Sequence, residues 1–462
     1  MANDLARSGS RPWLSGRWGE AELVGWYEQL EMTLPVREAP EYRRLVVPYD
    51  NDVRPVHRWF HVKEAYSADL LPAVLEDLGL TRRRRLAILD AFVGSGTTVV
   101  SAMDWAASRT SIAMRADGIE MNPFLSLVAR CKVSAARRQC EPLARTSRRI
   151  LEAVKHGSLD PAPVPALSTF SNTAYFRPGV LRELLELKAG ILRYANDAPT
   201  RALLLLALGG IVERSSRLRR DGRALRFERN KEPQSPHRLF EETIANFLAD
   251  LQIVSKVGEA HVHVGDGRRP TTIVPGAQYQ LALFSPPYIN NIDYTEIYKL
   301  EAWLLGLVSD HTQFREQRRA TMRSHPSVRF GSHLPGRHAV GEAAFDELLA
   351  PVLAAIPDTS DRTWRRRLIV EYFDDIASVL VEHRSLLERG SSRSFLACVI
   401  GNSVHGGHGA QFVVAADLLM ARLGELAGYD PIQVGIARRS TRFGRLSPFA
   451  RESIVMMRPF AA

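Results

Sequence analysis

A glycine-rich turn between a predicted strand and a predicted helix restricts the fold of this chain more than any other segment. The apolar run Leu86–Leu89 is typical of a buried parallel strand. The turn Asp90–Thr98 follows, and a helical pattern continues to about Ala107. A second strand then ends at Glu120. Strand, helix and strand in this order predict an α/β fold built on a parallel sheet.

The two glycines of this turn indicate a ligand site. Gly94 and Gly96 let the backbone approach a ligand closely, and the N-terminus of the following helix supplies N–H groups. A phosphate-binding loop would need a lysine after its last glycine, and none follows Gly96. A dinucleotide-binding turn would need a third glycine where Val99 stands. In addition, Asp90, which precedes these glycines, is an anion, and its charge favours a ligand with a positive or neutral centre over a pyrophosphate.

Glu120 is the acid at the end of the second strand. A carboxylate at this place in a strand–helix–strand unit is suited to bidentate contact with ribose hydroxyls. Many such residues are simply exposed strand-end carboxylates, but the spacing from the glycine turn favours the ribose contact.

A second chemical motif follows the apolar run Leu281–Phe284, which predicts another buried strand. Pro286 and Pro287 stop this strand and donate no backbone N–H, which leaves the carbonyls of Ser285 and Pro286 to accept hydrogen bonds. Tyr288 adds a flat aromatic face. Two acceptors and a stacking surface suit the exocyclic amino group of a planar base, although Pro-Pro turns after strands also occur for structural reasons alone.

Four segments, in this order, resemble the motifs of S-adenosylmethionine-dependent amino-methyltransferases that act on DNA: Phe60–Ser67, Asp90–Thr98, Gly118–Pro123 and Ser285–Tyr288. The Asp-x-Phe-x-Gly-Ser-Gly-Thr-Thr form of the turn is specific to that group. Ser-Pro-Pro-Tyr, in place of Asp-Pro-Pro-Tyr or Asn-Pro-Pro-Tyr, resembles the cytosine-N4 branch. The resemblance implies a Rossmann-like seven-stranded methyltransferase sheet with helices on both faces, together with a largely helical insertion.

The resemblance also implies S-adenosylmethionine as the cofactor and assigns roles to individual residues. Those expected to bind the cofactor are Phe60, Lys63, Ser67, Asp90, Phe92, Gly94, Ser95, Gly96, Thr97, Thr98, Glu120, Asn122 and Asp266. Those expected in the catalytic loop are Ser285, Pro286, Pro287 and Tyr288. Ser285 and the Pro286 carbonyl would hold the two amino hydrogens beside the methyl donor. Tyr288 would stack on a base flipped out of double-stranded DNA.

Several functions stay open at this level. The first expectation is a site-specific DNA methyltransferase acting on cytosine N4, with a restriction or defence component as an associated partner. Adenine-N6 methylation is the nearest alternative, because serine at position 285 shifts the preference without deciding it. RNA methylation and a non-catalytic nucleic-acid-binding component are the others. No cysteine lies next to Pro286, which argues against carbon-5 chemistry through a thiolate adduct.

The positions of the motifs divide the chain into six segments. Residues 1–45 are an N-terminal arm and 46–139 the cofactor-binding half of the core, whereas 140–259 are a helical insertion and a candidate DNA-recognition unit. Residues 260–309 carry the catalytic loop, 310–364 a basic insertion near the active site, and 365–462 the C-terminal strands of the core. Within the last segment, the pattern predicts one helix over Phe412–Ala427.

The charge balance favours a polyanionic partner. The chain has 61 Lys and Arg against 51 Asp and Glu, a net charge of +10. The arginines expected to contact nucleic acid are Arg217, Arg219, Arg220, Arg223, Arg318, Arg319 and Arg323. The three cysteines lack CxxC spacing, so no metal site is expected. Because no signal-peptide core or membrane-length apolar run is present, we expect a soluble cytoplasmic protein.

Overall fold

The computed structural model describes residues 18–109, 112–166, 174–221, 224–290, 292–325, 333–388, 393–407 and 411–460. Across these ranges, no helix combines the length and apolar character needed to cross a membrane. In the same part of the chain, no three His, Cys, Asp or Glu side chains are grouped closely enough to hold a metal ion.

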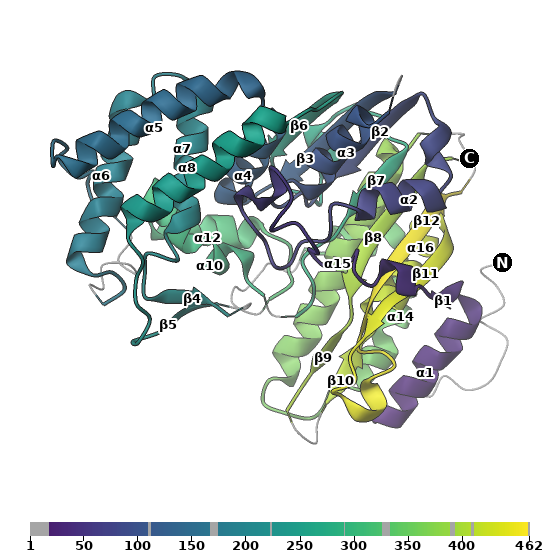
Figure 1. Cartoon of the computed structure of the whole chain (residues 1–462). Helices are drawn as coiled ribbons and strands as arrows, with labels where there is room; N and C mark the ends of the chain where they lie inside the picture. Colours follow the sequence, from purple (N-terminus) through teal and green to yellow (C-terminus); the bar gives the residue numbers. More distant parts are fainter. Residues whose placement is uncertain are drawn as a thin grey trace.

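An eight-stranded, mostly parallel sheet forms the centre of the fold, which confirms the predicted Rossmann-like α/β class (Figure 1). In spatial order the strands are β1 (Val36–Glu38), β11 (Tyr429–Arg439), β12 (Arg451–Pro459), β8 (Phe395–Gly401), β7 (Leu281–Phe284), β2 (Arg85–Asp90), β3 (Ala113–Glu120) and β6 (Glu259–Val264). β12 runs antiparallel to both of its neighbours. The strand beyond the seven expected is β1, which pairs in parallel with β11, so residues 36–38 of the N-terminal arm belong to the sheet.

The chain reverses its direction of travel across the sheet at β2. It proceeds outward from β2 to β3 and β6, then returns on the other side of β2 as β7. β2 and β7 are parallel, with Ile88 opposite Leu281 and Leu89 opposite Ala282. The turns after Asp90 and Phe284 therefore leave the sheet at the same edge and next to each other. Such a topological switch point is where open α/β sheets form their ligand crevices.

Helices cover both faces because the central strands bury side chains alternately on each side. Leu281 and Leu283 pack in the core beneath α2 (Leu70–Asp77) and α3 (Thr97–Ala107). Ala282 and Phe284 pack in the opposite core, against α15 (Arg362–Leu386), with α14 (Glu342–Ala354), α16 (Ala416–Leu426) and α1 (Glu20–Thr33) in the same layer. The sheet is thus the middle layer of three.

The insertion between β3 and β6 forms a helical unit at the β6 end of the sheet (Figure 1). It contains α5 (Cys140–Lys155), α6 (Pro178–Tyr194), α7 (Ala198–Ile211), α8 (Pro236–Ile253) and a hairpin of β4 (Leu218–Arg220) and β5 (Leu225–Phe227). The apolar helix α7 lies in the interior, where it packs on the other three helices and on α4 (Pro123–Ser134). Buried Asp250 of α8 accepts hydrogen bonds from Val56 N and Trp59 Nε1, which fastens this unit to the core.

The helix predicted over Phe412–Ala427 was wrong at its start. Phe412–Val414 form β10, which pairs antiparallel with β9 (Ser403–His405), and α16 begins only at Ala416. A run of Phe-Val-Val suits a strand, because a β-branched or aromatic side chain packs well on a pleated surface. The neighbouring strand β9 supplies the partner that sequence periodicity does not reveal.

We predict that Arg451→Met lowers the free energy of unfolding by about 3 to 5 kcal/mol, because it leaves a buried carboxylate without its cation. The fully buried Arg451 Nε donates to Asp417 on α16 at 2.7 Å, and its guanidinium also bonds Glu31 of α1. Arg458→Met is the matched control, because its pair with Asp430 is only half-buried and should contribute less than about 1 kcal/mol. Urea denaturation of both variants measures the difference, and equal losses would contradict the prediction.

Candidate cofactor pocket and active site

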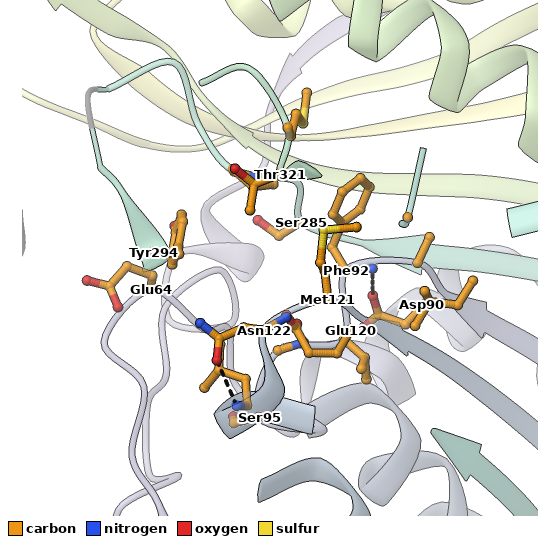
Figure 2. A pocket seen from close by; sticks show the side chains of 18 of the residues that line it. Glu64, Asp90, Phe92, Ser95, Glu120, Met121, Asn122, Ser285, Tyr294 and Thr321 are labelled. Carbon is orange, nitrogen blue, oxygen red and sulfur yellow. Dashed lines mark hydrogen bonds between the residues drawn. The ribbon is translucent and has the colours of Figure 1, made fainter. Parts of the chain in front are cut away.

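One cavity opens at the carboxyl edge of the sheet, directly above the switch point. Its empty volume is about 1080 Å³ with the open mouth included. The β2–α3 turn, the ends of β3 and β6, and the loop after β7 all contribute to its wall. In Figure 2, Ser285, Thr321 and Tyr294 lie on one side of the cavity, and Ser95, Glu120 and Asn122 lie on the other.

The glycine turn holds its shape through backbone freedom and one buried carboxylate. Gly94 and Gly96 have φ of +54° and +91°, a region that favours glycine. Asp90 accepts from Phe92 N at 3.0 Å and from Tyr66 Oη at 2.9 Å, and it also bonds the Thr98 hydroxyl. Burial raises the pKa of Asp90 to about 6. Asp90 therefore braces the turn from beneath while still lining the cavity.

Glu120 connects the end of β3 to the same turn. Its carboxylate accepts from Gly94 N at 3.0 Å and from Asn122 N at 2.7 Å. Burial raises its pKa to about 7. Asn122 caps α4 by accepting from Phe124 N and Leu125 N, so α4 begins directly beside the cavity.

Asp266, after β6, reaches the cavity while held by an arginine. Both of its oxygens accept from Arg268, which also donates to Asp375 of α15 and to the carbonyl of Ala320. A segment of residues 320–325 is anchored nearby, because Arg323 N donates to Asp375 at 2.7 Å. This segment contributes part of the cavity wall, including Thr321 and Met322.

The Ser-Pro-Pro-Tyr loop divides its side chains between two cavities. Ser285 and Pro287 line the cavity just described, whereas Tyr288 lines an adjoining, more open cleft with Lys63, Asn290, Arg438 and Glu452. Glu64, Ala65 and Tyr294 line both spaces. The loop therefore separates the cavity at the glycine turn from a second, more open cleft.

The structure brings most of the predicted cofactor residues together. Those that line the cavity are Asp90, Phe92, Gly94, Ser95, Thr97, Glu120, Asn122 and Asp266. Their common cavity depends on four separate strand ends, which the parallel order of β7, β2, β3 and β6 places along one edge. The cavity also receives residues that the sequence analysis assigned no role, such as Tyr66, Met121 and Met322. Tyr66 and Met121 lie inside two of the resembling segments without carrying a role there, and Met322 lies outside all four.

Five predicted cofactor residues lie outside the cavity wall: Phe60, Lys63, Ser67, Gly96 and Thr98. Phe60 packs edge-on against Phe124, with 4.9 Å between ring centroids, in the core shared with the helical unit. Lys63 is exposed at the second cleft. Buried Thr98 supports Asp90. At Gly96 an added Cβ would lie 3.1 Å from the Cα of Ala129, so this glycine permits close packing of α3 on α4. Ser67 is buried, and its hydroxyl accepts from Asp69 N.

Three of the arginines predicted to contact nucleic acid are held inside the protein. Arg220 pairs with Glu213 and Glu301, and its guanidinium lies over the rings of Phe60 and Tyr298. Arg318 pairs with Asp293 and Glu296. Buried Arg323 pairs with Asp374 and Asp375. Because carboxylates already bind these three guanidinium groups, the expected phosphate contact is corrected to an internal structural role for them. Arg217 is half-buried, Arg219 and Arg319 are exposed, and Arg223 lies outside the described residues.

We predict that the stability of the wild-type protein falls relative to a Glu120→Gln variant as pH rises from about 5 to 8. The pKa of Glu120 is about 7 in the folded protein against an ordinary value of 4.5, so the folded state holds the extra proton in this interval. Stability then decreases with rising pH, by ~1–3 kcal/mol for this group. Thermal unfolding of both ligand-free proteins across this pH range measures the difference. A constant difference would show that Glu120 is not the titrating group.

Comparison with known proteins identifies relatives that cover most of the chain. No family profile matches the chain. It is 24% identical over 322 residues to the Type II methyltransferase M.BsoBI of Geobacillus stearothermophilus, a match that covers 62% of this chain and 60% of that protein. It is also 24% identical over 422 residues to the Type II methyltransferases M.AvaI of Nostoc sp. and of Anabaena variabilis, covering 84% of this chain and 82% of each. These relatives confirm the resemblance of the motifs to those of DNA methyltransferases, and the similarity to Type II methyltransferases extends over most of the chain.

Proposed function

We propose that this protein transfers a methyl group from S-adenosylmethionine to the exocyclic N4 of a cytosine flipped out of double-stranded DNA, as the modification partner of a restriction system. The observation that carries the proposal is that Ser285 and the glycine turn line one cavity. A methyl donor in the turn and an amino group at Ser285 would then be neighbours. The relatives' printed names, Type II methyltransferase, support the reaction class.

The chemistry of the cavity fits this cofactor. Glu120 ends β3, where a carboxylate suits ribose hydroxyls, and Asp266, after the neighbouring strand β6, adds an acceptor to the same cavity. Phe92 and Ile119 offer apolar surface for a purine ring. The carboxyl groups of Asp90, Glu120 and Glu64 line the cavity, and their ionised forms favour a ligand carrying a sulfonium and an ammonium group.

The chain's own residues position the acceptor nitrogen. S-adenosylmethionine supplies an electrophilic methyl group on a sulfonium. An amino group conjugated to its ring has little lone-pair density, so the Ser285 oxygen and the Pro286 carbonyl must hold its hydrogens while the nitrogen becomes tetrahedral. The base would enter through the second cleft, where Tyr288 and Tyr294 offer aromatic rings.

Incubating the purified protein with S-adenosylmethionine and DNA, then digesting the DNA to nucleosides for mass spectrometry, tests the reaction. We expect N4-methylcytosine, and we expect Ser285→Ala to slow its formation about 100-fold because one amino-group acceptor is lost. Ser385→Ala, an exposed serine of α15, is the matched control and should leave the rate unchanged. Detection of N6-methyladenine in place of N4-methylcytosine would change the assigned base to adenine. Methylation of RNA but not of DNA would change the assigned substrate to RNA.

Arg219 and Arg319 are the two exposed arginines among those predicted to contact nucleic acid, and we propose that both contact DNA phosphates. We predict that Arg219→Ala and Arg319→Ala each weaken DNA binding to a similar degree for all sequences. Each should reduce the slope of log K against log[salt] by about 1, because one phosphate contact is lost. Fluorescence anisotropy at several salt concentrations measures this slope. Arg458→Ala, at the far end of β12 from the cavity, should leave the slope unchanged.

A further inference from the structure

A chain of hydrogen bonds leads from Ser285 through the partition between the two cavities. The Ser285 hydroxyl donates to Tyr288 Oη at 3.2 Å, and Tyr288 Oη donates to Glu452 Oε1 at 2.8 Å. The other oxygen of Glu452 accepts from Arg438 Nε at 2.6 Å. This series of hydrogen bonds therefore begins at the wall of the cavity at the glycine turn. It ends at the second cleft, which Tyr288, Glu452 and Arg438 line.

The carboxylate at the end of this chain sets the direction of every bond in it. An ionised carboxylate can only accept, so Tyr288 must donate to Glu452. The Tyr288 oxygen then accepts from the Ser285 hydroxyl, which turns the lone pairs of Ser285 toward the pocket. Burial and the charge of Glu452 raise the pKa of Tyr288 well above its ordinary value, so the phenol keeps the proton that it donates.

The backbone around these hydrogen bonds leaves little freedom for another arrangement of the three side chains. Glu452 of β12 and Gly401 of β8 are direct partners in the sheet. The ring of Tyr288 packs on Gly401, where an added Cβ would lie 2.7 Å from Cε2 of the ring. Glu452 is buried, with an exposed fraction of 8%. The phenol oxygen is thus held between Ser285 and Glu452.

We propose that Glu452 is a positioning residue for methyl transfer, acting through Tyr288 to make the Ser285 oxygen an acceptor for the amino group of the base. This inference rests on the proposed function. When the nitrogen–methyl bond forms and the methyl–sulfur bond breaks, the nitrogen carries one proton too many. In one concerted step that proton passes to Ser285 Oγ, the Ser285 proton to Tyr288 Oη and the Tyr288 proton to Glu452 Oε1, so the phenol is protonated before and after the step. Water in the second cleft then removes the proton from Glu452.

Single-turnover methyl transfer with excess enzyme tests the role, because it separates the reaction from product release. Glu452→Gln keeps the shape of the side chain, but its amide nitrogen can donate to Tyr288 and reverse the chain. We expect the rate to fall at least about tenfold, while the affinities for S-adenosylhomocysteine and for DNA change less than about twofold. Asp430→Asn is the matched control, because Asp430 forms the corresponding ion pair with Arg458 at the other end of the same two strands.

A double-mutant cycle with Tyr288→Phe distinguishes this role from a structural one. Tyr288→Phe keeps the ring and removes only the link, so it should slow the transfer by a similar factor. Glu452→Gln should then cause no further loss in the Tyr288→Phe background, because Glu452 acts only through that link. Additive losses, or a wild-type rate in either single variant, would overturn the inference and leave the proposed function intact. A wild-type protein that methylates no DNA would overturn both.

Discussion

The parallel pairing of β2 with β7 is the constraint on which the site depends. Parallel neighbours end at the same edge of a sheet, so the turn after Asp90 and the loop that begins at Ser285 must emerge side by side. Neither loop is a site alone, since in the proposed function one holds the cofactor and the other supplies acceptors for an amino group. An antiparallel pairing, or one strand inserted between them, would separate the two halves of the cavity.

Buried carboxylates are the second feature that unites this edge. Asp90 and Glu120 are both desolvated, and burial raises the pKa of each carboxyl group. Ionising these desolvated carboxyl groups near neutral pH costs folding stability. The hydrogen bonds from Tyr66, Gly94 and Asn122 offset only part of that cost. If the cavity binds the cationic ligand proposed above, this cost is met before the ligand arrives, as in other preorganised sites that exchange stability for function.

Several arginines of this basic chain form ion pairs inside the protein. Arg268 and Arg323 both bond Asp375 of α15, and together they fasten residues 320–325 across the cavity. Arg220 occupies a similar place between β4 and α11 (Lys299–Leu305), where Glu301 is buried. A net positive charge therefore says less about DNA contact than the exposure of each guanidinium does.

Short-range patterns in the sequence determined the strands β2 and β7, the glycine turn and the residue types at Asp90, Glu120 and Ser285, because spacing and residue type act locally. Only the tertiary structure decided that Tyr288 faces a separate cleft, that Arg323 is buried, and that Phe412–Val414 pair with β9. Each of these depends on a partner far away in the chain, such as Glu452 for Tyr288 or Asp375 for Arg323, and no local pattern encodes which distant residue arrives there.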